Sequence, residues 1–274
     1  MTEPLDELRE GNRAMWEAGD WDQLADNILP VGARLLDRIG AVGPGVRLLD
    51  IGTGSGSSIA IPAAQRGADV VASDLTDAAF GAARARAQAA GVDGIEWVVA
   101  DAQELPFEDA SFDVVTSTFG HMFAPDQGAA ARELVRVCRP GGTIAIACWT
   151  PDGKFGRFMV HIVMLMLPLP EGFRPPVLWG SEPHVTELLQ PLGVELEMGR
   201  RMVTIAYDSP EAHLVDWEEN LGPAIVARAG VDEERWAQAR ADLLAYFTEI
   251  NERDDGTMAA GYEYLETIAR KPAA

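Results

Sequence analysis

The chain has 274 residues, of which 47% are apolar and 24% charged, the usual balance of a globular protein with a sizeable core. Lys and Arg together number 22 and Asp and Glu 43, so the formal net charge is −21. A surface this negative repels both the phosphate backbone of nucleic acids and anionic lipid headgroups. Composition therefore argues against nucleic acids and membranes as partners.

Three further features indicate a reduced, cytoplasmic protein. The two cysteines, Cys138 and Cys148, are too few for a disulfide framework. The charged N-terminal segment lacks the apolar stretch of a signal peptide. The longest apolar run, 160–167, stops at Pro168, far short of the roughly 20 residues that a membrane-spanning helix needs.

The N-terminal part of the chain has a helical pattern, followed by an alternation of strands and helices. Over 5–40, apolar residues recur at steps of three and four, and Pro30 allows either two helices or one kinked helix. Short apolar, branched runs at 46–51, 68–73, 95–100, 112–117 and 142–148 are typical of strands buried on both faces. Between them, Thr76 is a candidate N-cap for a helix ending at Gly91, and Asp126 for one ending before Pro140. The alternation predicts an α/β fold with a doubly wound sheet.

Beyond residue 150 the alternation weakens. We expect a proline-rich, loop-rich segment at 151–183 with one apolar helix near 156–167, then a helix at 184–193. One or two strands are expected at 194–209, helices over 210–252 and a last strand at 262–271.

The most informative segment is the glycine loop LLDIGTGSG at 48–56, which follows the first strand and precedes a helix. Glycines allow a sharp turn and a close approach of the backbone to a ligand. The helix N-terminus behind the loop offers free N–H groups. Taken alone, the loop is also compatible with a strand-to-helix turn that binds nothing.

Two acidic residues at the ends of the next strands support a nucleoside ligand. Asp74 follows the second strand, 22 residues after Gly52, where a carboxylate accepts hydrogen bonds from ribose hydroxyls. Asp101 follows the third strand, and its carboxylate is placed to accept from an adenine amino group while Ala102 N–H donates to the ring. Either acid alone could instead cap a turn. Together with the glycine loop, they converge on one crevice.

NAD is the competing adenosine ligand. Its fingerprint is G-x-G-x-x-G/A, and Ser57 occupies the last position here. This departure, together with Asp101, favours a different ligand.

These motifs resemble the S-adenosylmethionine-dependent methyltransferases with a Rossmann-like fold. The small-molecule branch, akin to the ubiquinone and menaquinone biosynthesis methyltransferases, is the most similar. The resemblance rests on 48–56, 73–76, 100–117 and 133–146, covers about 46–150, and extends to a last, antiparallel strand. It implies a mostly parallel seven-stranded sheet with helices on both faces and a helical lid. The expected division is an N-terminal helical cap at 1–42, a cofactor-binding core at 43–150 and a substrate and lid region at 151–274.

The resemblance also implies roles for individual residues toward S-adenosylmethionine. Those around the methionine portion would be Asp50, Gly52, Thr53 and Gly54. Those around the adenosine would be Asp74 on the ribose, Leu75 beside the adenine, and Asp101 and Ala102 at the adenine edge. Thr118 and Phe119, just past the fourth strand, would lie near the sulfonium. No metal site is expected.

His121 is the candidate general base, because it follows the fourth strand and histidine titrates near neutrality. A structural histidine is the alternative. Aromatic residues are candidates for closing over the cofactor and lining a substrate pocket, with ordinary core packing as the alternative; they are Trp16, Trp21, Phe158 and Trp179, with Phe155 and Met159 in the same apolar segment.

The predicted function is methyl transfer from S-adenosylmethionine to an O, N or C nucleophile of a small, largely apolar metabolite. Three alternatives remain open: a non-methylating reaction such as cyclisation on the same scaffold, an NAD-dependent oxidoreductase, and a cofactor-binding protein without catalysis.

Overall fold

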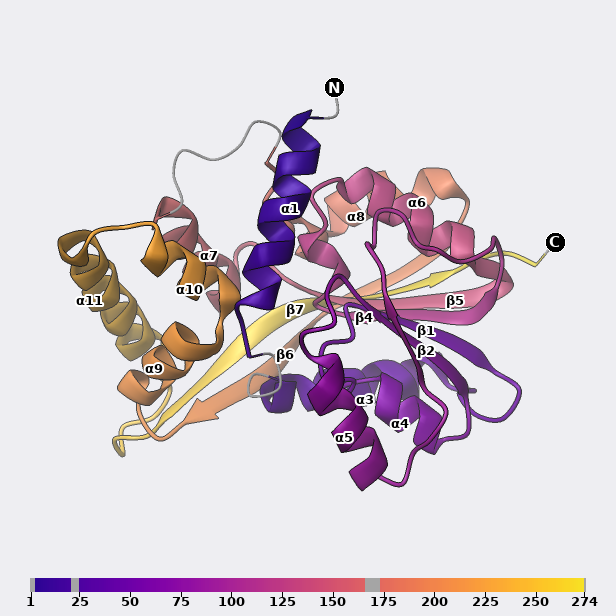
Figure 1. Cartoon of the computed structure of the whole chain (residues 1–274), viewed down its shortest axis with the longest axis horizontal. Helices are drawn as coiled ribbons and strands as arrows, with labels where there is room; N and C mark the ends of the chain where they lie inside the picture. The colour runs from indigo at the N-terminus through magenta and orange to yellow at the C-terminus, as the bar shows by residue number, and fades with distance from the viewer. Residues whose placement is uncertain (1–2, 21–24, 166–172, 274) are drawn as a thin grey trace.

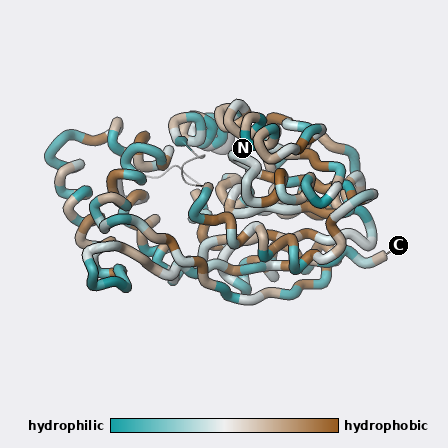
Figure 2. The backbone as a smooth tube through the Cα atoms, turned by 90° about the horizontal axis from the view of Figure 1, so that it is seen from below, coloured by the Kyte–Doolittle hydropathy of each residue, from teal (hydrophilic) through white to brown (hydrophobic). Residues whose placement is uncertain are grey.

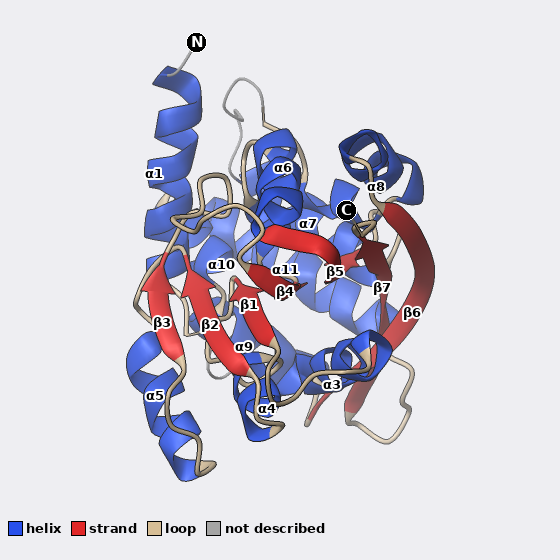
Figure 3. Cartoon of the chain, turned by 90° about the vertical axis from the view of Figure 1, so that its right-hand side faces the viewer, coloured by secondary structure: helices blue, strands red, loops and turns tan. Residues whose placement is uncertain are grey.

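The computed structural model describes residues 3–20, 25–165 and 173–273, and its centre is a seven-stranded sheet. The order across the sheet is β3-β2-β1-β4-β5-β7-β6 (Figure 3). β7 pairs antiparallel with both neighbours, and the other pairs are parallel. The strands are β1 Arg47–Ile51, β2 Asp69–Asp74, β3 Glu96–Val99, β4 Phe112–Thr118, β5 Cys138–Trp149, β6 Glu195–Tyr207 and β7 Met258–Arg270.

Helices cover both faces of this sheet, and a group of helices stands at one end (Figure 1). One face carries α3 Leu29–Ile39, α4 Ala60–Gln65 and α5 Phe80–Ala89, and the other α6 Gln127–Val137 and α8 Glu182–Leu189. The helical lobe comprises α7 Lys154–Leu165, α9 Pro210–Asn220, α10 Gly222–Ala229 and α11 Glu233–Ile250. Helix α1 Glu3–Glu17 packs against α10. The short 3₁₀ helices are η1 Asp26–Ile28, η2 His121–Phe123, η3 Pro176–Gly180 and η4 Gln190–Leu192.

The long strands β6 and β7 connect the sheet to the helical lobe. They pair along their whole lengths, from Glu195 opposite Arg270 to Tyr207 opposite Met258. Their far ends extend beyond the parallel strands and contact α7 and α9 (Figure 1). Seen from below in Figure 2, the helical lobe again stands at one end of the molecule. The lobe is thereby held beside the carboxyl ends of the parallel strands. Among the described residues, no helix combines the length and apolarity that crossing a bilayer requires.

The doubly wound, mostly parallel sheet with its antiparallel last strand confirms the expected fold class. The region 194–209 forms one strand rather than two, and the last strand begins at Met258, before the expected position. Asp126 is the N-cap of α6, accepting a hydrogen bond from Ala129 N at 2.8 Å. Pro30 lies in the first turn of α3, where a missing N–H costs little, so the N-terminal region forms separate helices.

The predicted N-cap at Thr76 is wrong. Helix α5 begins at Phe80 with Ala79 as its N-cap, and Gly91, with φ +69°, follows its end. The reason lies in the preceding turn, where the backbone N–H groups of Leu75 and Thr76 point at the Asp74 carboxylate. This turn takes up Thr76, the residue that the sequence pattern assigns as the N-cap, and the helix begins later, at Phe80.

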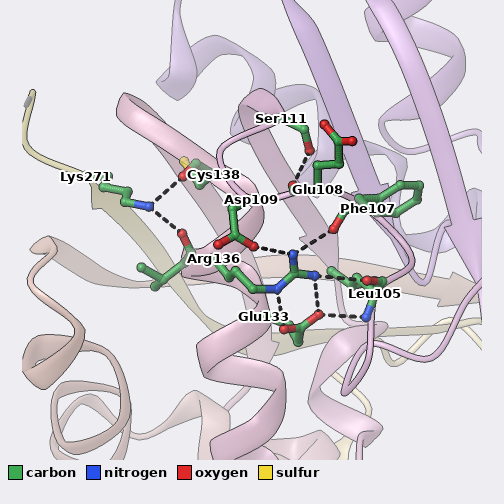
Figure 4. Close-up of polar contacts among 10 residues, drawn as sticks. Leu105, Phe107, Glu108, Asp109, Ser111, Glu133, Arg136, Cys138 and Lys271 are labelled. Atoms are coloured by element: carbon green, nitrogen blue, oxygen red, sulfur yellow. Dashed lines mark hydrogen bonds and ion pairs between the residues drawn. The ribbon is translucent and has the colours of Figure 1, made fainter.

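The loop between β3 and β4 is fastened to α6 by Arg136 (Figure 4). Its guanidinium donates to the carbonyl oxygens of Leu105 at 2.9 Å and Phe107 at 2.7 Å. It also pairs with Glu133 at 2.7 Å and with Asp109 at 2.8 Å. Glu133 in turn accepts a hydrogen bond from Leu105 N at 2.7 Å. These contacts fix the loop that leaves the carboxyl end of β3.

Candidate active site

A cavity lies where the carboxyl ends of the parallel strands meet the helical lobe. We call one part of its wall the strand-end half; its members are Gly52, Gly54, Ser55, Asp74, Leu75, Asp101, Ala102 and Thr118. We call the other part the aromatic half; its members are Asn27, Ile28, Trp149, Phe155, Met159, Ile205, Trp217, Leu221 and Pro223. Phe119 and His121, which follow Thr118 in the chain, also line the cavity and are counted in neither half.

The glycine loop has a backbone geometry that favours glycine. Gly52, Gly54 and Gly56 have φ angles of +65°, +51° and +72°. A Cβ on Gly52 would lie 2.6 Å from the Cα of Gly120. The two backbones therefore touch, and the turn after β1 leaves a concave backbone surface open to the cavity.

Asp74 links the end of β2 to the glycine loop. Its Oδ2 accepts a hydrogen bond from Gly54 N at 2.8 Å. Burial raises the pKa of the Asp74 carboxyl, an effect opposed by the backbone hydrogen bonds from Gly54, Leu75 and Thr76. The carboxylate is thus held at the cavity wall by donors of its own chain, with lone pairs left for a ligand hydroxyl.

Asp101 is held in place in a similar way at the end of β3. Its Oδ1 accepts from Gln103 N at 2.8 Å and from Gln103 Nε2 at 2.9 Å. The side-chain oxygen Oε1 of Gln103 accepts a hydrogen bond from Asp126 N at 2.8 Å, which connects this turn to the start of α6. From α1, Arg9 Nε lies 3.6 Å from Asp101 Oδ2. Helix α1 therefore reaches the adenine-edge position that the sequence predicts.

Asp50 and Thr53 lie beneath the loop instead of lining the cavity. The Asp50 carboxylate accepts hydrogen bonds from Thr53 Oγ1 at 2.7 Å and Thr116 Oγ1 at 3.0 Å. Burial raises the pKa of Asp50 to about 7. Direct contact of these two side chains with a ligand, as the resemblance implies, therefore requires that the loop above them move. In this structure Asp50 and Thr53 stabilise the glycine loop through these hydrogen bonds.

Phe119 occupies a strained position at the end of β4. Its φ of +63° is unusual for an aromatic residue, and such strain concentrates at functional sites. The ring stacks on Trp149 with centroids 3.8 Å apart and planes 5° from parallel. Trp149 stacks in turn on Phe155 at 4.9 Å. This column of rings begins at the strand ends and continues into the aromatic half.

His121 is almost fully buried, at 1% exposure. Its Nε2 lies 3.8 Å from Cys148 Sγ, and its ring meets the edge of Trp179 at 4.5 Å. Burial lowers the pKa of His121 to about 3. The ring is therefore neutral at neutral pH, and its conjugate acid is too strong for efficient proton abstraction. This environment disfavours the general-base role and favours a neutral hydrogen-bonding group, with Nδ1 unpartnered among the described residues.

Of the aromatic residues proposed to line or close the pocket, only some lie at the cavity. Trp16 lines the cavity and packs edge-on against Phe123 at 4.5 Å. Phe158 packs instead against Trp217 at 3.9 Å in the core of the helical lobe, and Trp179 lies behind His121. Neither of them lines the cavity. Trp21 lies outside the described residues.

Sequence reasoning missed several lining residues. Trp149 is the last residue of β5 and directly follows the strand predicted at 142–148. An aromatic residue at the carboxyl end of a predicted parallel strand is the signal that could have identified it. Trp217 and Leu221 read only as apolar positions of a helix, and Asn27 carried no signal. Among the described residues, no three His, Cys, Asp or Glu side chains come together as a metal site.

Comparisons with known proteins agree with this geometry. Residues 49–146 match the family model of the methyltransferase domain. The chain is 39% identical over 262 residues to the uncharacterized protein Rv1405c of Mycobacterium tuberculosis, covering 95% of this chain and 94% of that protein. It is 43% identical over 126 residues to the demethylmenaquinone methyltransferase of Clavibacter sepedonicus, covering 44% of this chain and 50% of that protein.

Phosphoethanolamine N-methyltransferase 2 of Haemonchus contortus, solved with S-adenosyl-L-methionine, has the same fold. The TM-score is 0.56 at 20% identity, covering 89% of this chain and 52% of that chain. The methyltransferase domain and these relatives show that the chain belongs to the S-adenosylmethionine-dependent methyltransferases. The solved structure shows that the Rossmann-like fold is shared. The family of this domain uses S-adenosylmethionine, which sets aside the NAD-dependent alternative.

The strand-end half fits this cofactor. The close contact of Gly52 with Gly120 leaves backbone, not side chain, facing the ligand. Thr118 Oγ1 is buried and has no hydrogen-bond partner among the described residues, so the wall includes a polar atom for a ligand to satisfy.

Proposed function

We propose that this methyltransferase methylates an O, N or C nucleophile of a small, largely apolar metabolite. The observation that carries this proposal is the composition of the aromatic half, whose described members include no charged side chain. The charged side chains among the described lining residues are Arg9, Asp74 and Asp101. Asp74 and Asp101 belong to the strand-end half, and Arg9 lies on α1, close to Asp101. A charged substrate group in the aromatic half would lose its hydration without gaining a counter-ion.

The strand-end half would hold the cofactor. Asp74 would accept hydrogen bonds from the ribose hydroxyls, with Leu75 packing beside the adenine. Asp101 and Ala102 N–H would bind the adenine edge, and the Gly52 and Gly54 backbone would approach the methionine portion. When bound, S-adenosylmethionine supplies an electrophilic methyl group on a positively charged sulfur.

The residues between the two halves would favour the reaction mainly by positioning. Phe119 would present to the sulfonium the ring face that Trp149 does not cover, an arrangement that attracts a cation. Trp16 and Phe123 cover the strand-end half and would exclude water. His121 would act as a neutral hydrogen-bond partner for the nucleophile.

Titration calorimetry with S-adenosylmethionine, S-adenosylhomocysteine and NAD⁺ tests the cofactor assignment. Micromolar binding of the first two and none of NAD⁺ is expected. The release of S-adenosylhomocysteine, followed by mass spectrometry, then tests the substrate class. Uncharged phenols and quinols are expected to become methylated, and phosphoethanolamine is not. Activity confined to the charged acceptor would overturn the proposed substrate class.

The same assay separates methyl transfer from cyclisation or another rearrangement. A product formed from an acceptor without stoichiometric S-adenosylhomocysteine would show the non-methylating reaction. His121→Ala is expected to change kcat by a similar factor at every pH, because a neutral partner does not titrate in this range. A kcat loss confined to one side of neutrality would restore the general-base role.

A further inference from the structure

Asn27 contributes a polar side chain to an otherwise apolar region of the cavity. It belongs to η1 and lines the aromatic half near Ile28, Ile205 and Leu221. Its amide nitrogen Nδ2 donates a hydrogen bond to the Tyr207 hydroxyl at 3.0 Å. Tyr207 lies on β6, two residues after Ile205, so this contact holds Asn27 against the side of the cavity that the lobe forms.

A chain of hydrogen bonds fixes which end of the Asn27 amide faces Tyr207. The Tyr207 hydroxyl donates to Asp216 Oδ2 at 2.6 Å, and Asn220 Nδ2 donates to Asp216 Oδ1 at 2.7 Å. A carboxylate only accepts, so the single Tyr207 proton is committed to Asp216 and the Tyr207 oxygen must accept from Asn27. Burial raises the pKa of Tyr207 far above its ordinary value, so the phenol remains protonated.

The amide carbonyl of Asn27 is consequently the group left for a ligand. Among the described residues, none donates a hydrogen bond to Asn27 Oδ1. An acceptor beside apolar walls is costly when a ligand covers it without donating to it. We propose that Asn27 determines specificity by accepting a hydrogen bond from a hydroxyl or N–H group of an otherwise apolar substrate. Tyr207 and Asp216 are positioning residues that hold the amide in this orientation. The inference rests on the proposed apolar substrate class and adds one polar requirement to it.

Two probes with the same ring system test this requirement by calorimetry on the protein saturated with S-adenosylhomocysteine. 2-Naphthol donates a hydrogen bond, whereas 2-methoxynaphthalene only accepts one. The wild-type protein is expected to bind 2-naphthol about tenfold more tightly, the effect of one hydrogen bond. Asn27→Leu, of similar volume, is expected to remove the preference while binding 2-methoxynaphthalene at least as tightly as the wild type.

Tyr207→Phe separates positioning from simple loss of structure. Without the Tyr207 oxygen, the Asn27 amide is free to turn its NH₂ group toward the cavity. The affinity for 2-methoxynaphthalene is then expected to rise relative to 2-naphthol, although Asn27 itself is unchanged. A merely structural defect would weaken both probes equally. Asn220→Ala is the matched control, since it leaves the bond from Tyr207 to Asp216 Oδ2 in place, and it should keep the tenfold preference.

The outcomes distinguish this inference from the function on which it rests. Equal wild-type affinity for the two probes overturns the role of Asn27 and leaves the apolar substrate class standing. Failure of both probes to bind, with S-adenosylhomocysteine bound normally, overturns both. A preference that survives in Asn27→Leu assigns the hydrogen bond to another group and also overturns the inference.

Discussion

The strand-end half of the cavity consists largely of backbone and of acidic residues that follow strands, whereas the aromatic half consists of side chains from elements far apart in the chain. Gly52 and Gly54 act through their φ angles, and Asp74 through the hydrogen bond that it accepts from Gly54 N of the glycine loop. Trp149 and Trp217, in contrast, come from β5 and α9 and line one cavity because β6 and β7 connect the lobe to the sheet.

This difference explains how one scaffold can keep a cofactor and change its substrate. A loop whose geometry depends on glycine tolerates few substitutions, because a Cβ on Gly52 would meet the backbone of Gly120 and one on Gly56 would meet the Trp97 ring. A wall of Trp, Phe, Met and Ile side chains can change shape residue by residue without disturbing that loop. Function on a common fold is therefore set mainly by the second region.

Gly52→Ala should have the largest effect, eliminating measurable binding of S-adenosylhomocysteine by calorimetry. The new Cβ would lie 2.6 Å from Gly120 Cα, so the loop must shift. Gly91→Ala is the matched control: its φ of +69° is similar, but its Cβ would meet nothing within 4 Å. It should lose about 1–2 kcal/mol of stability from the left-handed backbone and retain cofactor affinity. Normal affinity in Gly52→Ala would contradict a backbone-built site.

Asp74→Ala should lower the affinity for S-adenosylhomocysteine about 100-fold, since each hydrogen bond to a charged group contributes about 1.5–3 kcal/mol. Asp69→Ala, at the opposite end of β2, is the control. The Asp69 side chain is 68% exposed and pairs with Arg47 at 3.7 Å on the surface. Such a pair contributes about 0–1 kcal/mol and should leave affinity unchanged. Equal affinities of the two variants would remove Asp74 from the ribose site.

The sequence predicts the strand-end half well because its signals are local. Asp74 and Asp101 can be placed from the strand that each follows, and parallel strands bring their carboxyl ends to one edge. The wrong N-cap at Thr76 shows the limit of local reasoning even here. The pattern gives a candidate capping residue, but the Asp74 carboxylate orders the Thr76 turn instead.

The members of the aromatic half could not be predicted from the sequence in the same way. Phe158 and Trp217 have similar sequence signals, yet Phe158 lies in the lobe core while Trp217 also reaches the cavity. Which face of a helix meets a cavity depends on how α7 and α9 pack, which no spacing within either helix encodes. Asn27 depends on Tyr207, 180 residues away in the chain. Hydropathy therefore predicted an apolar pocket but only part of its membership.

The smallest effect concerns pH, to which the two regions should respond in opposite directions. Asp50, beneath the glycine loop, has its pKa raised to about 7, whereas His213, buried against Tyr207, has its pKa lowered to about 3. On acidification from pH 8 to 5, folded Asp50 takes up a proton that the unfolded chain does not, which stabilises the fold. Over the same range, unfolded His213 takes up a proton that the folded chain excludes, which destabilises it.

Free energies of unfolding from urea titrations at pH 8 and pH 5 would reveal both contributions. On acidification, the free energy of unfolding of the wild type should rise by about 2–3 kcal/mol relative to that of Asp50→Asn. It should fall by about 2 kcal/mol relative to that of His213→Phe. Thr53 and Thr116 can still hydrogen-bond to Asn at position 50. His213 stacks on Phe247 with ring centroids 4.2 Å apart, and Phe at position 213 should keep this stacking. Parallel pH profiles for the wild type and either variant would show that the group replaced titrates alike in the folded and unfolded chains, and the electrostatic contrast between the two regions would not hold.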